Sequence, residues 1–337
     1  MPEHRSNGSG RFGVSDVGVV AIGRNEGERL QRCIRSLPAQ LGAVVYVDSG
    51  STDGSVEFAR EHGAEVVALD MSVPFTAARA RNAGVERLRQ ARPELALVQF
   101  VDGDCELDEL WIPAALESLA ADPQVAVVCG RRREIAPRDT LYNQLCDMEW
   151  DTPIGDAEAC GGDALMRLAA LAEVGGYDGS MIAGEEPELC LRLRRAGHRV
   201  LRIDHEMTRH DAQMTRLSQW WTRNVRAGHA YAEGYHRYGS DTERYNERAV
   251  LSNIAWGIGL PATSLFFALP TLGTSLWLLG LFGVLYKRVY AHRLAHGDSA
   301  SDAALCARYT ALGKFPQAQG WLQFHYRRLT GQQNTLI

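Results

Sequence analysis

Two aspartates separated by one glycine, Asp102-Gly103-Asp104, follow directly after an apolar run at residues 95–101. Paired carboxylates at a strand end suit a hard divalent cation, such as Mn²⁺ or Mg²⁺, that is bound partly by the phosphates of a substrate. Such an ion would offset the charge of a departing diphosphate. His210 follows a predicted strand at residues 200–203 and could complete the site, because imidazole also binds Mn²⁺. A single histidine is more often a surface or packing residue, so both interpretations of His210 stay open.

A turn of small polar residues, Asp48-Ser49-Gly50-Ser51-Thr52-Asp53-Gly54-Ser55, follows the apolar residues 43–47. Small residues let the backbone approach a ligand closely, and Asp48, with Ser49 beside it, could hydrogen-bond a nucleobase or ribose. Asp53 could instead cap the helix that follows, which is a common role of aspartate. Asn25 and Glu26 come just after another apolar run, residues 17–22. These polar residues are therefore candidates for binding a nucleotide.

A third acidic cluster, Gly184-Glu185-Glu186-Pro187-Glu188, opens a predicted helix in which Pro187 suits the first helical position. Glu186 shares a helix face with Leu189 and Leu193, so this face points inward. A carboxylate at the edge of a cleft is what deprotonation of a hydroxyl requires. Burial should raise the pKa of Glu186, but we expect the helix N-terminus and the nearby metal to outweigh burial and to leave the carboxylate ionised at neutral pH. The alternative is that these glutamates only stabilise the helix N-terminus, which explains Glu185 or Glu188 better than Glu186.

The elements that must position these residues alternate regularly. Apolar runs too continuous for half-exposed strands, separated by helical patterns, indicate a mostly parallel sheet covered on both faces, and ligands of such sheets bind beyond the carboxyl ends of the strands. The predicted strands are residues 17–22, 43–47, 65–69, 95–101 and 125–129, and the predicted helices include residues 56–62, 77–90 and 111–121. The fold class is therefore α/β.

The composition excludes some classes of protein. The chain has 337 residues and a net charge of -5, which argues against a general nucleic-acid binder. Its seven cysteines are odd in number and never form a C-x-x-C pair, so neither a zinc site nor a disulfide framework is indicated, and a reducing compartment fits best.

One segment differs sharply from the rest, because no charged residue occurs between Arg248 and Lys287. This run is long for one membrane helix of about 20 residues and slightly short for two. Pro270 is a plausible turn, and positive charge on both sides favours two cytoplasmic flanks, hence a hairpin or a re-entrant pair in the membrane. The alternative is a buried helical pair in a soluble domain.

These patterns divide the chain into five parts. The predicted parts are a flexible tail at residues 1–16, a catalytic domain at 17–230, an interfacial amphipathic linker at 231–248, a hydrophobic membrane hairpin or re-entrant pair at 249–288, and a cytoplasmic helical tail at 289–337.

The chain resembles the inverting glycosyltransferases of family 2, which have the GT-A fold. The resemblance covers residues 17–228. Its first motifs are Asn25-Glu26, the D-x-x-S-T-D-G-S turn at residues 48–55 and A-R-N-x-G at residues 80–84. Further along the chain are the D-x-D at Asp102 and Asp104 and, before the glutamate cluster, Gly175-Gly176-Tyr177-Asp178. This likeness implies a Rossmann-like, mostly parallel sheet flanked by helices, here followed by C-terminal membrane-associated helices.

The resemblance also implies site residues. Glu186 stands where the family has its catalytic aspartate, with Glu185 as the alternative base. Arg81 would lie over the nucleotide and diphosphate, and Asp163 would contact sugar or acceptor. Arg223 or Arg226 would grip the diphosphate, unless this Arg-aromatic segment is only an interfacial helix. Asp104, helped by Asp102, would bind the metal.

The partners implied are a nucleotide-sugar donor, with a UDP-sugar as first candidate, and a glycan or lipid-linked acceptor at the cytoplasmic side of the inner membrane. Two rival functions are a sugar-nucleotide pyrophosphorylase and a non-catalytic scaffold. A sugar-nucleotide pyrophosphorylase would carry a glycine-rich basic loop after its first strand, where this chain has Gly23-Arg24-Asn25-Glu26. A non-catalytic transferase-like scaffold is opposed, though not excluded, by the presence of Asp102, Asp104 and Glu186.

Overall fold

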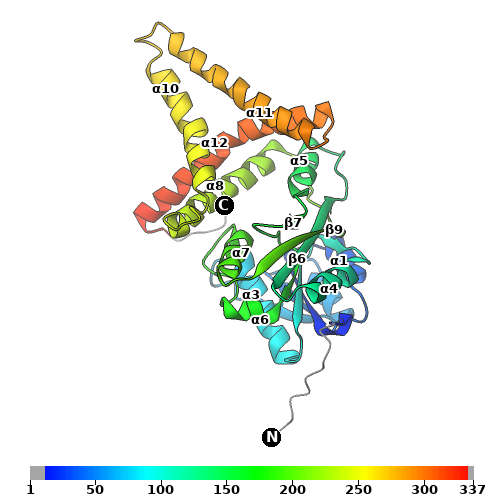
Figure 1. Ribbon diagram of the computed structural model, residues 1–337. Coiled ribbons are helices and arrows are strands. Elements are labelled where there is room, and N and C mark those ends of the chain that lie inside the picture. Colours follow the sequence, from blue (N-terminus) through cyan, green and yellow to red (C-terminus); the bar gives the residue numbers. More distant parts are fainter. Residues whose placement is uncertain (1–11, 333–337) are drawn as a thin grey trace. The chain divides into compact units, whose positions relative to one another are not determined.

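The computed structural model describes residues 12–332, which divide into two compact units (Figure 1). The first unit comprises residues up to 135 together with 149–180 and 185–212, and the second comprises residues 136–148, 181–184 and those from 213 onward. The catalytic motifs of the sequence lie in the first unit and the uncharged run lies in the second.

A nine-stranded sheet forms the centre of the first unit, in the order β3-β2-β1-β4-β8-β6-β9-β5, with β7 paired to β9. The strands β1–β4 are all parallel, and the antiparallel pairs all involve β8 or β9. The strand bounds are β1 Val17–Gly23, β2 Ala43–Asp48, β3 Glu65–Ala68, β4 Leu97–Asp102, β5 Cys105–Leu107, β6 Val125–Glu134, β7 Gly155–Asp156, β8 Ala164–Arg167 and β9 Arg199–His210. The predicted Rossmann-like sheet flanked by helices is confirmed, and its second half is mixed.

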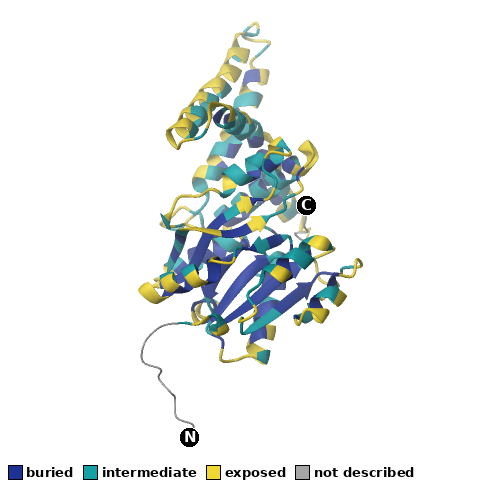
Figure 2. Cartoon of the chain, turned by 90° about the vertical axis from the view of Figure 1, so that its right-hand side faces the viewer, coloured by how far each residue is buried: buried dark blue, intermediate teal, exposed yellow. Residues whose placement is uncertain are grey.

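Helices cover this sheet because its strands are apolar on both faces. In β1 and β4 nearly every residue is buried. Figure 2 shows the strands of the sheet as mostly buried. The covering helices are α1 Glu28–Ser36, α2 Ser55–Glu61, α3 Ala77–Ala91, α4 Trp111–Ala121, α6 Leu168–Glu173 and α7 Glu185–Arg195. Helix α3 approaches the sheet closely at Gly84, where a Cβ atom would lie only 2.3 Å from Val20 Cγ1.

The second unit is built from helices. The long helices α8 Leu217–Tyr238 and α12 Ala300–Thr330 lie against each other, and α5 Leu141–Trp150 belongs mostly to this unit. Their contact depends on Gly228 and Gly320, because a Cβ atom on either would meet a backbone carbonyl oxygen of the other helix at 2.0 Å.

The uncharged run folds into two helical arms. The first arm is α9 Glu247–Ile254, η2 Ala255–Gly259 and α10 Leu260–Phe266, and the second is η3 Thr274–Gly280 followed by α11 Leu281–Ala295 (Figure 1). Within the described residues, Glu247–Phe266 is one helix that is long and apolar enough to cross a membrane by length and composition.

Two predicted boundaries differ from the structure. Residues 1–11 of the predicted tail lie outside the described residues, but Val14–Asp16 already form a 3-10 turn and the Phe12 ring lies 5.1 Å from the Arg167 guanidinium carbon. The predicted end of the catalytic domain at residue 230 falls inside α8. That helix is uninterrupted and packs on α12, so the boundary lies at about residue 212.

Candidate active site

The carboxyl ends of three parallel strands bring the sequence motifs to one edge of the sheet. Gly23 of β1 is in register with Asp48 of β2, and Ile22 is in register with Asp102 of β4. The Asn25 side chain joins the first two strand ends, because its Oδ1 accepts a hydrogen bond from Thr52 N at 2.8 Å. Asn25 N in turn donates to Ser51 Oγ at 2.8 Å.

Asp48 and Asp53 both hold the loop between them in shape. Asp48 Oδ2 accepts hydrogen bonds from the amides of Gly50 and Ser51 at 2.9 and 3.0 Å, and Asp53 Oδ1 accepts one from Ser55 N at 3.1 Å. The N-cap of α2 is Gly54 and no side chain caps it, so Asp53 is not the cap that the sequence suggested, although it accepts a hydrogen bond from the first residue of the helix. Ser49 is buried, and its hydroxyl has no hydrogen-bond partner among the residues that the structure describes. Nucleotide binding by Asp48, Ser49 and Asp53 stays a prediction.

Arg81 on α3 connects the aspartate pair to the glutamate cluster. Its Nη2 lies 2.9 Å from Asp102 Oδ1, and its Nη1 lies 3.0 Å from Glu185 Oε1 and 2.9 Å from Glu186 Oε1. The guanidinium is almost fully buried. Gly162 packs against it so closely that a Cβ atom there would lie 2.6 Å from Arg81 Nη2. One cation thus holds the candidate metal-binding and base ends of the site together.

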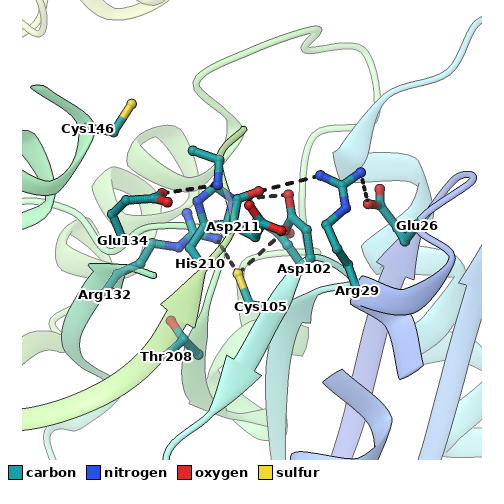
Figure 3. Close-up of polar contacts among 12 residues, drawn as sticks. Glu26, Arg29, Asp102, Cys105, Arg132, Glu134, Cys146, Thr208, His210 and Asp211 are labelled. Carbon is teal, nitrogen blue, oxygen red and sulfur yellow. Dashed lines mark hydrogen bonds and ion pairs between the residues drawn. The ribbon is translucent and has the colours of Figure 1, made fainter. Parts of the chain in front are cut away.

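Arg132 on β6 is a residue of the site that the sequence analysis missed. Its Nη2 lies 2.7 Å from Asp102 Oδ2 and 3.3 Å from Cys105 Sγ, and its Nε lies 3.0 Å from Asp163 Oδ2 (Figure 3). The sequence feature that could have indicated Arg132 is the Arg131-Arg132-Arg133 run just after a predicted strand. In the structure this strand, β6, continues five residues past its predicted end at 129. Arg81 and Arg132 together bind both oxygens of Asp102.

Asp163 is fully buried beneath the aspartate pair. Its Oδ1 accepts a hydrogen bond from Asp102 N at 3.0 Å, and its Oδ2 accepts one from the Thr208 hydroxyl at 2.7 Å. The structure thus gives Asp163 the role of holding Asp102 in place. The predicted contact with sugar or acceptor stays a prediction.

Asp104 and His210 converge as expected for a metal pair. Cys105 of β5 is paired with His210 of β9, and His210 Nε2 lies 3.1 Å from Asp104 Oδ2. Burial would raise the pKa of Asp104, but the hydrogen bond and charge of His210 outweigh it and hold the pKa below its usual value. Asp104, Cys105 and His210 each offer a ligand atom within 4.8 Å of the others. Burial raises the pKa of the Cys105 thiol well above its usual value, so carboxylate and imidazole remain as donors, a set that fits Mn²⁺.

Asp102 is ionised for a different reason. Burial alone would raise its pKa, but the adjacent Arg81 and Arg132 guanidinium groups hold the pKa well below its usual range. With both oxygens bound by arginine, Asp102 holds the two cations in place, and Asp104 is the aspartate whose carboxylate lies beside His210.

The helix N-terminus does not by itself keep the pKa of Glu186 low, contrary to that part of the expectation. Burial, followed by the charge of Glu185, raises the pKa of Glu186 to about 7, and the opposing attraction of Arg81 is smaller. The reason is that the two neighbouring carboxylates share one arginine in a buried place, which the helix N-terminus does not offset. Glu188 is different, because it is fully buried and pairs with Arg192 one helical turn later at 2.7 Å. Glu188 thus has a structural partner within its own helix.

Glu26 lies beside the aspartates at the end of β1. Its Oε2 pairs with Arg29 Nη2 at 2.6 Å (Figure 3), and burial, followed by the charge of Asp104, raises its pKa. Arg223 lies on α8 in the second unit, where its Nη1 donates to Cys146 Sγ at 3.1 Å. Its contact with a diphosphate stays a prediction, as does that of Arg226.

A mostly parallel sheet with an aspartate pair, a buried arginine and two glutamates at its edge is the arrangement that the resemblance to GT-A glycosyltransferases implied. The model of glycosyl transferase family 2 matches residues 19–173. Over these residues the chain therefore matches family 2 of the glycosyltransferases, as its motifs indicated.

Curated relatives carry the same class of name. The pre-mycofactocin glycosyltransferase of Mycobacterium tuberculosis is 29% identical over 198 residues, which are 55% of this chain and 40% of the relative. The succinoglycan biosynthesis protein ExoA of Rhizobium meliloti is 28% identical over 189 residues, 52% of this chain and 57% of that protein. The matches thus cover less than two thirds of each relative.

Among solved structures, the mannosyltransferase PcManGT from Pyrobaculum calidifontis, in complex with GDP-Man and Mn²⁺, has a TM-score of 0.56 at 18% identity. The alignment covers 93% of this chain and 87% of that one. TarS of S. aureus has a TM-score of 0.50 at 13% identity, and its alignment covers 90% of this chain and 54% of the TarS chain. At these identities the likeness concerns the fold.

Proposed function

We propose that this chain transfers a sugar from a nucleoside-diphosphate donor to a hydroxyl of a glycan or lipid-linked acceptor, with inversion at the anomeric carbon. The observation that carries the proposal is the Arg81 network, which places Asp102 and the Glu185–Glu186 pair on one guanidinium. The groups proposed to bind the leaving diphosphate and to remove the acceptor's proton therefore all contact the Arg81 side chain. A solved mannosyltransferase of the same fold contains GDP-Man and Mn²⁺, which supports a donor of this chemical type.

The divalent cation would be held by Asp104 and His210 and, when bound, would supply positive charge to the diphosphate. The chain's own residues do the rest. Arg81 and Arg132 add cationic charge at the same place, and a guanidinium can bind phosphate oxygens through two parallel hydrogen bonds. Glu186 accepts the acceptor's proton while the acceptor oxygen bonds to the anomeric carbon and the bond from that carbon to the diphosphate oxygen breaks. A pKa near 7 suits a general base at neutral pH.

We also propose that the enzyme works at the cytoplasmic side of the inner membrane, with a UDP-sugar as the first donor to try. The uncharged run with exposed apolar side chains supports a membrane location, because lipid-linked acceptors are found there. Acceptors used in surface polysaccharide or glycolipid synthesis fit such a location.

Turnover assays test the proposed reaction. Purified chain is incubated with UDP-, GDP- and dTDP-sugars and a lipid-linked acceptor extract, with Mn²⁺ or with chelator, and the product is examined by NMR. We expect metal-dependent transfer and a product anomer opposite to that of the donor. Retention of configuration would contradict the single displacement. Tight donor binding without turnover under any of these conditions would favour a non-catalytic scaffold.

A further inference from the structure

The two arms of the second unit end in a strongly apolar tip. The exposed side chains here are Leu265, Phe266, Leu269, Leu272, Leu276 and Trp277, of which Leu272 is 94% exposed. Figure 2 shows the tip as an exposed projection. Isolated exposed apolar residues need no explanation, but a contiguous group of this size indicates a surface with a partner.

Many polar groups of the tip are paired with one another. The hydroxyls of Thr271 and Thr274 donate to the carbonyl oxygens of Phe267 and Thr271, and Ser275 donates across to the Ser264 carbonyl at 2.7 Å. The amides of the turn also donate within it, among them those of residues 267, 268, 271, 272 and 273. A non-helical turn in hydrocarbon requires this, because no water is available there to pair with its backbone. The tip therefore presents hydrocarbon outward.

An aromatic cluster marks where the arms leave the body of the unit. The Phe282 ring lies 5.4 Å from Trp256 on the first arm and 5.7 Å from Phe315 on α12. At the same level Gly257 meets α12, since a Cβ atom there would lie 2.3 Å from Lys314 O. Only the chain beyond this cluster projects freely.

The projecting arms are too short to cross a bilayer. Nine residues at 1.5 Å each, from 258 to the end of α10, give about 14 Å. Seven residues of η3 at 2.0 Å each also give about 14 Å. The hydrocarbon core of a bilayer is about 30 Å thick, so the tip reaches roughly its midplane.

The positions of the nearby positive charges agree with a tip at the bilayer midplane. Lys287 and Arg288 are exposed on α11, about 22 Å from the tip along the arm, which is the level of the headgroups when the tip is at the midplane. No aspartate or glutamate occurs between Glu247 and Asp298, so this surface is complementary to anionic lipid. A second copy of the chain would present the same cations and repel them.

Helix α12 continues the apolar surface along the membrane plane. Phe315, which contacts α11, is followed at helical spacing by Leu322, Tyr326 and Leu329, all exposed and on one face. An amphipathic helix of this kind lies at the boundary of headgroups and acyl chains.

We propose that the second unit inserts into one leaflet only: the tip at Leu272 lies near the bilayer midplane, α12 rests in the interface, and the arms do not cross. The inference rests on the membrane association proposed above and adds its depth and sidedness. It makes the uncharged run a re-entrant pair and excludes a spanning hairpin.

Depth-dependent quenching tests it with the full chain. The environment-sensitive fluorophore NBD is attached to Leu272→Cys or Leu322→Cys in a Cys306→Ser background, since the other six cysteines are buried. The protein is added to preformed vesicles of equal parts phosphatidylcholine and phosphatidylglycerol. We expect lipids brominated near the chain ends to quench label 272 most, and lipids brominated near the glycerol to quench label 322 most. Dithionite should bleach label 272 from neither side.

The possible outcomes distinguish the insertion depth of the tip from the binding of the protein to the membrane. Bleaching of label 272 by dithionite trapped inside the vesicles would overturn the single-leaflet geometry while leaving membrane association intact. Failure to sediment with vesicles, together with a dimer in light scattering, would overturn both and identify a second copy as the partner. The variant Leu272→Asp should lose vesicle binding, whereas Leu110→Asp, at a 62% exposed leucine of the first unit, should not.

A charge variant tests the headgroup contact separately. Lys287→Gln and Arg288→Gln should each weaken partitioning into the anionic vesicles about fivefold and leave binding to neutral vesicles unchanged. Arg60→Gln, at an exposed arginine of α2, is the matched control and should have no effect. Equal loss in all three variants, or no loss at 287 and 288, would contradict a headgroup level for these cations.

Discussion

At the scale of single residues, the site is a chain of charges joined by two buried arginines. Arg81 pairs with Glu185, Glu186 and Asp102, and Arg132 joins Asp102 to Asp163. Because the buried acids and arginines compensate one another, each group's ionisation depends on its neighbours. This coupling raises the pKa of Glu186, whose carboxylate shares Arg81 with that of Glu185.

The first prediction concerns the base. Glu186→Gln should lower the transfer rate about 10²–10⁴-fold, the usual loss on removing a positioned general base, while leaving donor affinity nearly unchanged. Glu186→Asp should retain part of the activity, because it keeps the carboxylate at shorter reach. Steady-state kinetics and donor titration check this. If Glu185→Gln abolishes transfer while Glu186→Gln stays near wild type, the base is Glu185.

The second prediction concerns pH. The base must be ionised to accept a proton, so with a pKa near 7 the transfer rate should rise about tenfold per pH unit below 7 and level off above it. The raised pKa has the opposite effect on stability. The folded state binds this proton more tightly than the unfolded state, so the free energy of unfolding falls as pH rises from about 4.5 to 7.

It follows that Glu186→Gln should unfold no more easily than wild type at pH 8, although its transfer rate is much lower. Denaturant titration at pH 5 and pH 8 measures this. A large loss of stability at pH 8 would mean that the ionised Glu186 stabilises the fold, contrary to its raised pKa.

At the scale of elements, α3 and the turn before α7 position the site through one short motif. Arg81 enters the charge network, and Asn82 clamps Tyr177 by exchanging two hydrogen bonds with its backbone, at 2.7 and 2.9 Å. Gly84 then allows α3 to lie directly on Val20. Residues 80–84 thus link the sheet, the turn and the base-bearing helix.

The third prediction follows from that contact. Gly84→Ala should destabilise the protein by about 1–3 kcal/mol, because the added methyl overlaps Val20 and α3 must shift. Denaturant unfolding measures the loss. The double variant with Val20→Ala should lose less than the sum of the two single variants, since the clashing methyls are gone. Strict additivity would show that α3 does not rest on Val20.

The sequence predicted the elements whose signals are local. Apolar runs located β1 to β4, and their shared carboxyl edge correctly brought Asp48 and Asp102 to the same edge of the sheet, on either side of β1. Arg132 was missed because its role arises only when β6 runs past residue 129 and lies across from Asp102. The pKa of Glu186 was mispredicted because its burial beside Glu185 is a tertiary property.

At the scale of the whole molecule, one chain combines a sheet unit with a charged site and a helical unit with an apolar tip. The division at about residue 212 was not visible in the sequence, because α8 is amphipathic and reads as a continuation of the catalytic domain. The uncharged run was visible because its composition differs from everything around it. In our proposals, the first unit performs the transfer and the second keeps the enzyme at the lipid surface.

The central claim is that the sheet edge binds a nucleoside diphosphate through a divalent cation held by Asp104 and His210. Calorimetric titration of UDP, GDP and dTDP, with Mn²⁺ and then with excess chelator, tests it most directly, in wild type and in Asp104→Asn. We predict at least one nucleotide that binds in Mn²⁺, more than tenfold weaker binding in chelator, and no metal effect in Asp104→Asn. Equal affinity with and without metal in wild type, or an undiminished metal effect in Asp104→Asn, would contradict the account.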